Sequence, residues 1–159
     1  MADSNARKIL EAAVTAIQDL NLTGVSDANI KAIEAAETAE ELEGCFTGKP
    51  YIALMIVDGE TIDALGPSPV EYDDVGYPVF VGIVACRTAD DEATDDAQRL
   101  WRQTIRTAFI RQRLVSGATT LAHTCIFEPR PAVNARMRRL NNIWSSSFVL
   151  RFHTREART

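Results

Sequence analysis

Side chains suited to catalysis are sparse in this 159-residue chain, which has two histidines and three cysteines. Neither His123 nor His153 lies in a two-histidine zinc pattern, and no serine lies in a Gly-x-Ser-x-Gly elbow. A nucleophile–base pair such as Cys125 with His153 would form only if the fold happened to bring the two together. Cys45, Cys86 and Cys125 are odd in number and widely spaced, which favours buried, reduced thiols.

Metal and phosphate chemistry have equally little support in the sequence. One acidic run could suggest a cation site: Asp90, Asp91, Glu92, Asp95 and Asp96. The run lacks the ligand spacing and central glycine of a calcium loop. We interpret it as a solvated loop leading into a helix whose dipole favours negative charge at its start. No phosphate-binding glycine motif is present. We therefore expect a protein that is not an enzyme, with no catalytic, metal or cofactor site.

Charge is distributed very unevenly along the chain. Residues 1–99 hold 6 Lys/Arg against 20 Asp/Glu, whereas residues 100–159 hold 11 Arg, no Lys and 2 Asp/Glu. Arginine favours planar, bidentate contacts with carboxylates or phosphates. The arginines could bind nucleic-acid phosphates, bind the acidic surface of another copy, or form a solvated face paired with residues 1–99. Because the net charge is −5, we favour assembly over a dedicated nucleic-acid binder.

Six arginines are the candidate interface residues of this assembly. They are Arg102, Arg106, Arg136, Arg138, Arg139 and Arg151. We expect them to contact acidic protein surface more often than phosphate.

Residues 1–50 are predicted to form an acidic, helical N-terminal segment. Ser4 or Asn5 can cap a first helix that ends near residue 20. A second, short helix is expected over about residues 26–36. Thr38 and Glu41 have the spacing of a capping box and predict one more helical turn.

Residues 51–154 are predicted to form a sheet-plus-helix core. The runs 51–57 and 79–86 are apolar on both alternating faces, as in central strands covered on both sides. Helices would cover one side, and a partner subunit is a candidate for the other. The turn-rich stretch 58–78 between them predicts an arm or rim loop, and part of it could instead pair as a hairpin extension.

The second half of this core should begin with the clearest helix in the chain. It is predicted from about Thr94 to about Arg113, with an apolar stripe facing a basic one. The basic stripe consists of Arg99, Arg102, Arg106 and Arg113. Residues 119–127 and 143–153 alternate as strands, with Phe148, Leu150 and Phe152 on one face. Residues 155–159 are expected to fray.

The order of elements predicts a single α+β domain spanning residues 1–159. We expect a mostly antiparallel sheet of about four strands, with a long amphipathic helix on one face and the N-terminal helical segment beside it. No apolar run approaches the roughly 20 residues of a membrane span, and residues 1–5 do not begin a secretory signal.

This order of elements and their residue patterns resemble those of the tail terminator, or tail completion, proteins of tailed bacteriophages. The resemblance covers most of residues 51–154: a strand at 51–57, a long turn-rich loop, and a strand at 79–87. A helix containing Leu100-Trp101-Arg102-Gln103-Thr104-Ile105-Arg106 follows, and the last strand ends Phe148-Val-Leu-Arg-Phe-His153.

The resemblance implies a structural virion protein with no enzymatic activity. Such a protein forms a homo-oligomeric ring, commonly a hexamer, that halts growth of the tail tube and joins it to the head–tail connector. Its partners would be itself, the tail tube protein and the connector protein, with DNA passing through its channel without specific binding. It would be assembled in the host cytoplasm and reside in the tail or neck of the virion. Alternatives are another neck or head-completion protein, or a non-specific nucleic-acid-binding accessory protein using the C-terminal arginines.

Overall fold

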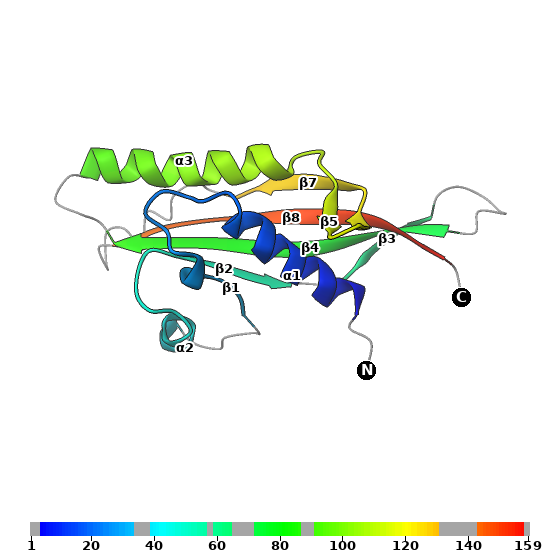
Figure 1. Cartoon of the computed structure of the whole chain (residues 1–159), viewed down its shortest axis with the longest axis horizontal. Helices are drawn as coiled ribbons and strands as arrows, with labels where there is room; N and C mark the ends of the chain where they lie inside the picture. Colours follow the sequence, from blue (N-terminus) through cyan, green and yellow to red (C-terminus); the bar gives the residue numbers. More distant parts are fainter. Residues whose placement is uncertain are drawn as a thin grey trace.

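In a computed structural model of the chain, six strands form one mixed sheet, and helices pack against it (Figure 1). The structure describes residues 4–33, 39–56, 59–64, 72–86, 91–130 and 143–157. In chain order the elements are α1 (Asn5–Gln18), the 3₁₀ helix η1 (Asp27–Asn29), β1 (Ile30–Ala32), α2 (Ala39–Gly44), β2 (Tyr51–Ile56), β3 (Thr61–Ala64), β4 (Tyr72–Cys86), α3 (Asp91–Phe109), β5 (Leu114–Ser116), β6 (Thr119–Ala122), β7 (Thr124–Pro129) and β8 (Ile143–Ala157).

The sheet has the order β1-β2-β4-β8-β7, and β3 pairs with the first part of β4. β1 runs parallel to β2, whereas the other pairs in this sheet are antiparallel. β5 and β6 form a separate two-stranded hairpin. The α+β class is therefore confirmed, but the sheet is mixed and has six strands instead of about four. The strands missed are short: β1 has three residues and β3 has four.

β4 is the central strand, in agreement with its apolar character on both faces. It pairs with β8 along 15 residues on one side, and with β2 and then β3 on the other. Pro78 lies between the stretches of β4 that pair with β2 and β3, and its register partner in β8 is Arg151.

One face of the sheet carries α1 and α3. Ile9, Ala13 and Ile17 of α1 are fully or almost fully buried in the main core. The alternation predicted for the last strand is confirmed, because Phe148, Leu150 and Phe152 all point into this core. α3 adds Trp101, Ile105 and Phe109 to it.

The opposite face has a smaller apolar cluster near β1 and β2. Phe46 stacks on Tyr51 there, with ring centroids 4.3 Å apart, beside Ile33 and Ala53. Leu42 of α2 packs against this cluster. The two faces of the sheet are therefore covered by different elements.

Two predictions for the N-terminal segment have opposite outcomes. The first helix is confirmed, and Ser4 caps it by accepting a hydrogen bond from the backbone N of Arg7 at 3.3 Å. The second helix, expected over 26–36, is wrong: η1 gives way at Ile30 to β1, which pairs with β2. Ile30 and Ile33 have helical spacing, but pairing with a distant strand overrides this local pattern. The Thr38 of the expected capping box lies outside the described residues.

Other predicted boundaries also differ from the structure, and α3 begins at Asp91 instead of about Thr94. α3 ends at Phe109 and not near Arg113, and Arg111 just beyond it has a positive φ of 58°. The expected strand 119–127 is interrupted at His123, which separates β6 from β7. β8 continues to Ala157, whereas fraying was expected from residue 155. Within the stretch 58–78, β3 pairs antiparallel with the start of β4, which confirms the alternative of a hairpin extension. In the described part of the chain, no helix is long and apolar enough to cross a membrane.

The hydroxyl of Tyr77 ties β4 to the end of β8, and this contact predicts a pH effect. It donates to Glu156 Oε1 at 2.5 Å, and Asn5 Nδ2 donates to the same oxygen at 2.7 Å. Burial, followed by the bond to Glu156, raises the pKa of Tyr77. Above about pH 10 an unfolded tyrosine loses its proton while the folded one keeps it, so stability falls as pH rises.

Tyr77→Phe should therefore lower the free energy of unfolding by about 1–2 kcal/mol at neutral pH. It should also lose part of the decline in stability above about pH 10. Urea unfolding at neutral and alkaline pH measures both effects. If the free energy of unfolding falls above about pH 10 as steeply in the variant as in the wild type, Tyr77 has the same pKa in the folded and unfolded states.

Candidate assembly interface

The described residues include three of the six candidate interface arginines: Arg102, Arg106 and Arg151. The other three, Arg136, Arg138 and Arg139, lie outside the described residues.

Arg102 reaches from α3 onto the sheet and binds groups of its own chain. Its Nη1 donates to Ser146 Oγ at 2.6 Å and to the carbonyl oxygen of Ser147 at 2.8 Å. Its Nη2 donates to the carbonyl oxygen of Arg130 at 2.7 Å. The planar guanidinium thus joins α3 to β8 and to the residue that follows β7.

The same guanidinium lies against two aromatic rings. Its Cζ is 5.7 Å from the ring centroid of Phe127 and 5.2 Å from that of Phe148. Burial lowers the pKa of Arg102, and the positive charge of Arg106 lowers it further. A cation partly removed from water is stabilised by ring faces and carbonyl oxygens. Arg102 therefore has a structural role in the subunit, and its predicted contact with a partner remains a prediction.

Arg106 lies one helical turn further along α3 in a different environment. Its side chain is exposed, and it makes no hydrogen bond or ion pair with any described residue. It is therefore available to a partner.

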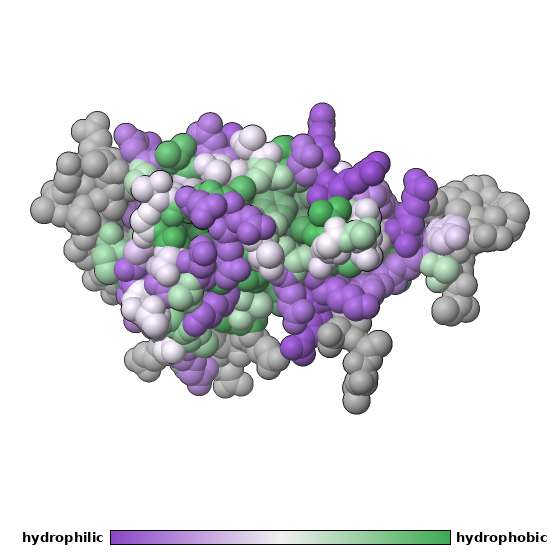
Figure 2. Space-filling view, viewed as in Figure 1, coloured by the Kyte–Doolittle hydropathy of each residue, from purple (hydrophilic) through white to green (hydrophobic). Residues whose placement is uncertain are grey.

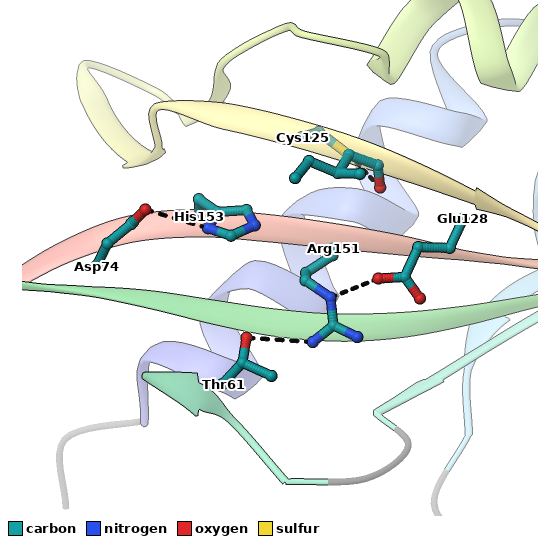
Figure 3. Close-up of polar contacts among 7 residues, drawn as sticks. Thr61, Asp74, Cys125, Glu128, Arg151 and His153 are labelled. Carbon is teal, nitrogen blue, oxygen red and sulfur yellow. Dashed lines mark hydrogen bonds and ion pairs between the residues drawn. The ribbon is translucent and has the colours of Figure 1, made fainter. Parts of the chain in front are cut away.

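Arg151 lies on the face of the sheet opposite α1 and α3, as Figure 3 shows. Its Nε donates to Glu128 Oε1 at 2.5 Å, and its Nη1 donates to Thr61 Oγ1 at 3.3 Å. A Cβ at Gly76 would lie 2.5 Å from Thr61 Oγ1 and 3.2 Å from Arg151 Cδ. Glycine at this position therefore leaves room for a contact that links β3, β7 and β8.

Exposed charge differs between the two edges of the sheet. Near β7 lies a group that we call the basic edge: Arg99, Arg106, Arg111 and Arg130, all exposed. α3 packs on β7, and the backbone N of Arg111 donates to the carbonyl oxygen of Cys125 in β7.

Near β1 lies a second group, which we call the acidic edge: Asp27, Glu41 and Glu43, all exposed. Lys49 pairs with Glu43 at 2.7 Å. Because β1 and β7 are the two ends of the strand order, the acidic and basic edges are far apart. Figure 1 shows the same separation, with α3 along the top of the molecule and α2 at the bottom.

The two histidines both lie near Asp74 of β4. No catalytic role was expected for either histidine from the sequence. His153 Nδ1 lies 3.3 Å from Asp74 Oδ2 (Figure 3). His123 Nε2 lies 3.7 Å from Asp74 Oδ1. The Cys125–His153 pair does not form, because the register places Cys125 beside Phe152 on the other face of the sheet.

The cysteines only partly match their expected burial. Cys125 is buried, and burial raises its pKa to about 12. Cys45 and Cys86 are exposed, which corrects the expectation that all three are buried. Cys86 is the last residue of β4.

The acidic run before and within α3 is described only in part. Asp90 lies outside the described residues, and Asp96 is exposed in α3. In the ranges that the structure describes, no three His, Cys, Asp or Glu side chains are placed to hold a metal ion.

The sequence did not identify Asp74 or Glu128 as partners of candidate residues. Asp74 contacts His153, 79 residues away, and Glu128 contacts Arg151 across neighbouring strands. Strand register brings both pairs together. For Glu128 and Arg151, the opposite charges at the end of one predicted strand and within the next were a signal in the sequence.

In comparisons with known proteins, no protein-family model and no curated protein sequence matches this chain.

Proposed function

We propose that this chain is a structural subunit of the tail terminator type, and that six copies form a homo-oligomeric ring. Such a ring would end the tail tube of a phage, join it to the head–tail connector and reside in the virion. The tail tube protein and the connector protein would be its neighbours, and DNA would pass through the channel without specific binding.

The separation of the basic edge from the acidic edge is the observation that supports this proposal most. A head-to-tail contact needs two unlike, complementary surfaces on each subunit, and such contacts form a ring when the rotation between neighbours closes. A basic edge of one copy facing the acidic edge of the next would satisfy that requirement. The exposed side chain of Arg106 would lie in this contact.

We further infer that α3 is the long amphipathic helix expected from the sequence. Trp101, Ile105 and Phe109 are buried, whereas Arg99 and Arg106 are exposed. The helix would hold the subunit together on one side and present arginines to a neighbour on the other. Leu100 is 59% exposed and would be covered by the same neighbour.

Charge reversal at Arg106 tests the proposal. Arg106→Glu should weaken self-association at low salt by at least about tenfold, because it places a like charge against the acidic edge. The subunit should stay folded, because the exposed Arg106 side chain makes no hydrogen bond or ion pair with the described residues. Lys8→Glu on α1 is the matched control, since it reverses an exposed charge away from the basic edge. Equal association of both variants and the wild type would count against the proposal.

Nucleic-acid binding is the alternative outcome. If duplex DNA binds with a steep salt dependence while the chain stays monomeric, the arginines serve phosphates instead of another copy. Absence of duplex binding at about 50 mM salt would remove that alternative, because phosphate contacts are strong at low salt.

A further inference from the structure

A recess of about 410 Å³ lies where β6, the start of β7 and the end of β8 meet. Its lining brings together three nitrogen-bearing side chains from separate parts of the chain: Arg113, His123 and Arg155. Thr120 and Thr154 add hydroxyl groups to the same wall. The recess continues into a larger groove of about 1100 Å³ between α1 and the β5–β6 hairpin. In Figure 2 apolar side chains beside the hairpin are framed by hydrophilic ones.

The strand arrangement explains why these side chains converge. Leu114 pairs with Ala122 in the hairpin, so Arg113 lies next to the bend at His123. On the other side of that bend, the backbone N of His123 donates to the carbonyl oxygen of His153, two residues before Arg155. The bend that corrected the predicted strand therefore places His123 between two arginines.

Neither arginine is neutralised by a described neighbour. The side chains of Arg113 and Arg155 are exposed and make no hydrogen bond or ion pair with the described residues. The charged groups that face His123 are Arg113, Arg155, and Asp74 of β4, whose Oδ1 lies 3.7 Å from its Nε2. Asp74 also faces His153 of β8. Two guanidinium groups therefore face one carboxylate, and this excess of positive charge suits a negatively charged group.

We propose that this recess receives a side-chain carboxylate from a second copy of the chain, as part of the contact described under Proposed function, on which it rests. Guanidinium groups match carboxylates in planar, bidentate geometry, and the threonine hydroxyls can donate to the same oxygens. His123 in the wall of the recess directly precedes β7, the strand beside which the basic edge lies. A second copy offers the carboxylates of its acidic edge, whereas a polyphosphate would meet a chain with net charge −5.

Self-association of paired variants gives the first test. At about 50 mM salt, Arg113→Gln with Arg155→Gln should weaken association by about tenfold or more. Arg7→Gln with Lys31→Gln removes two charges from positions outside the lining of the recess and of the adjoining groove, and should weaken association much less. Equal loss in both double variants, or none in the first, would overturn the carboxylate site and leave the proposed ring standing. A wild-type chain that never associates would overturn both.

A direct binding measurement gives the second test. The chain has only two histidines, so proton NMR should show two ring C2–H signals, which His123→Gln assigns. A pentaglutamate peptide should shift the His123 signal saturably and shift that of the buried His153 less. The Arg113→Gln, Arg155→Gln variant should lose this response. A shift with inorganic phosphate and none with the peptide would overturn the assignment to a carboxylate, as would no shift with either.

Discussion

Replacing Arg102 by Met should lower the free energy of unfolding of the subunit by about 2–4 kcal/mol. The substitution keeps much of the aliphatic length but removes the donors to Ser146, Ser147 and Arg130. It also removes the cation from the rings of Phe127 and Phe148. Urea unfolding at high salt and low protein concentration, where association does not contribute to stability, measures the loss.

Arg106→Met is the matched control on the same helix. It makes the same chemical change one turn away, at an exposed side chain with no described partner, so stability should change by about 0.5 kcal/mol or less. Arg102→Lys should fall between wild type and Arg102→Met, because an ammonium keeps the charge but not the planar fork. Equal stability of the Arg102→Met and Arg106→Met variants would show that the Arg102 contacts do not hold α3 on the sheet.

Asn29→Ala should destabilise the subunit by about 2–3 kcal/mol. Asn29 is buried in η1 and its amide makes four hydrogen bonds. Its Nδ2 donates to the carbonyl oxygens of Gly48 and Pro50 at 3.2 and 3.1 Å. Its Oδ1 accepts from the backbone N and the hydroxyl of Thr47 at 3.1 and 2.9 Å. Alanine would leave these groups without their partner and loosen the connection that leads into β2.

Thr47→Val separates the parts of this network. It removes only the hydroxyl bond to Asn29 and should cost about 1 kcal/mol. Thermal or urea unfolding of the two variants gives the comparison. If Thr47→Val lowers the free energy of unfolding as much as Asn29→Ala does, the bonds from Asn29 to the carbonyl oxygens of Gly48 and Pro50 do not stabilise the fold.

The sequence predicted those features of the fold that depend on local pattern. Phe148, Leu150 and Phe152 alternate with polar residues, and period-two alternation with one apolar face identified the buried side of β8. Ser4 precedes an apolar stripe, which identified the cap of α1. β4 is apolar on both faces, which indicated a central strand.

Features that depend on distant pairing could not be predicted from such patterns. Ile30 and Ile33 fit a helix as well as a strand, and only β2 decides between them. His123 was expected to continue an alternating strand, because the sequence does not indicate the bend that moves it toward Asp74. Arg102 and Arg106 are equivalent in the sequence, being four residues apart on one basic stripe. The sheet beneath α3 distinguishes them, since only Arg102 can reach the carbonyls at the start of β8.

The mass of the particles that the purified chain forms at about 50 mM salt tests the proposed function most directly. Mass measurement over a range of protein concentrations, with negative-stain images of the same sample, gives both size and shape. The proposal predicts one closed oligomer seen as a ring, which dissociates toward single subunits as salt is raised to about 500 mM and screens the charged edges. A chain that keeps the mass of one subunit at every concentration in low salt would contradict it.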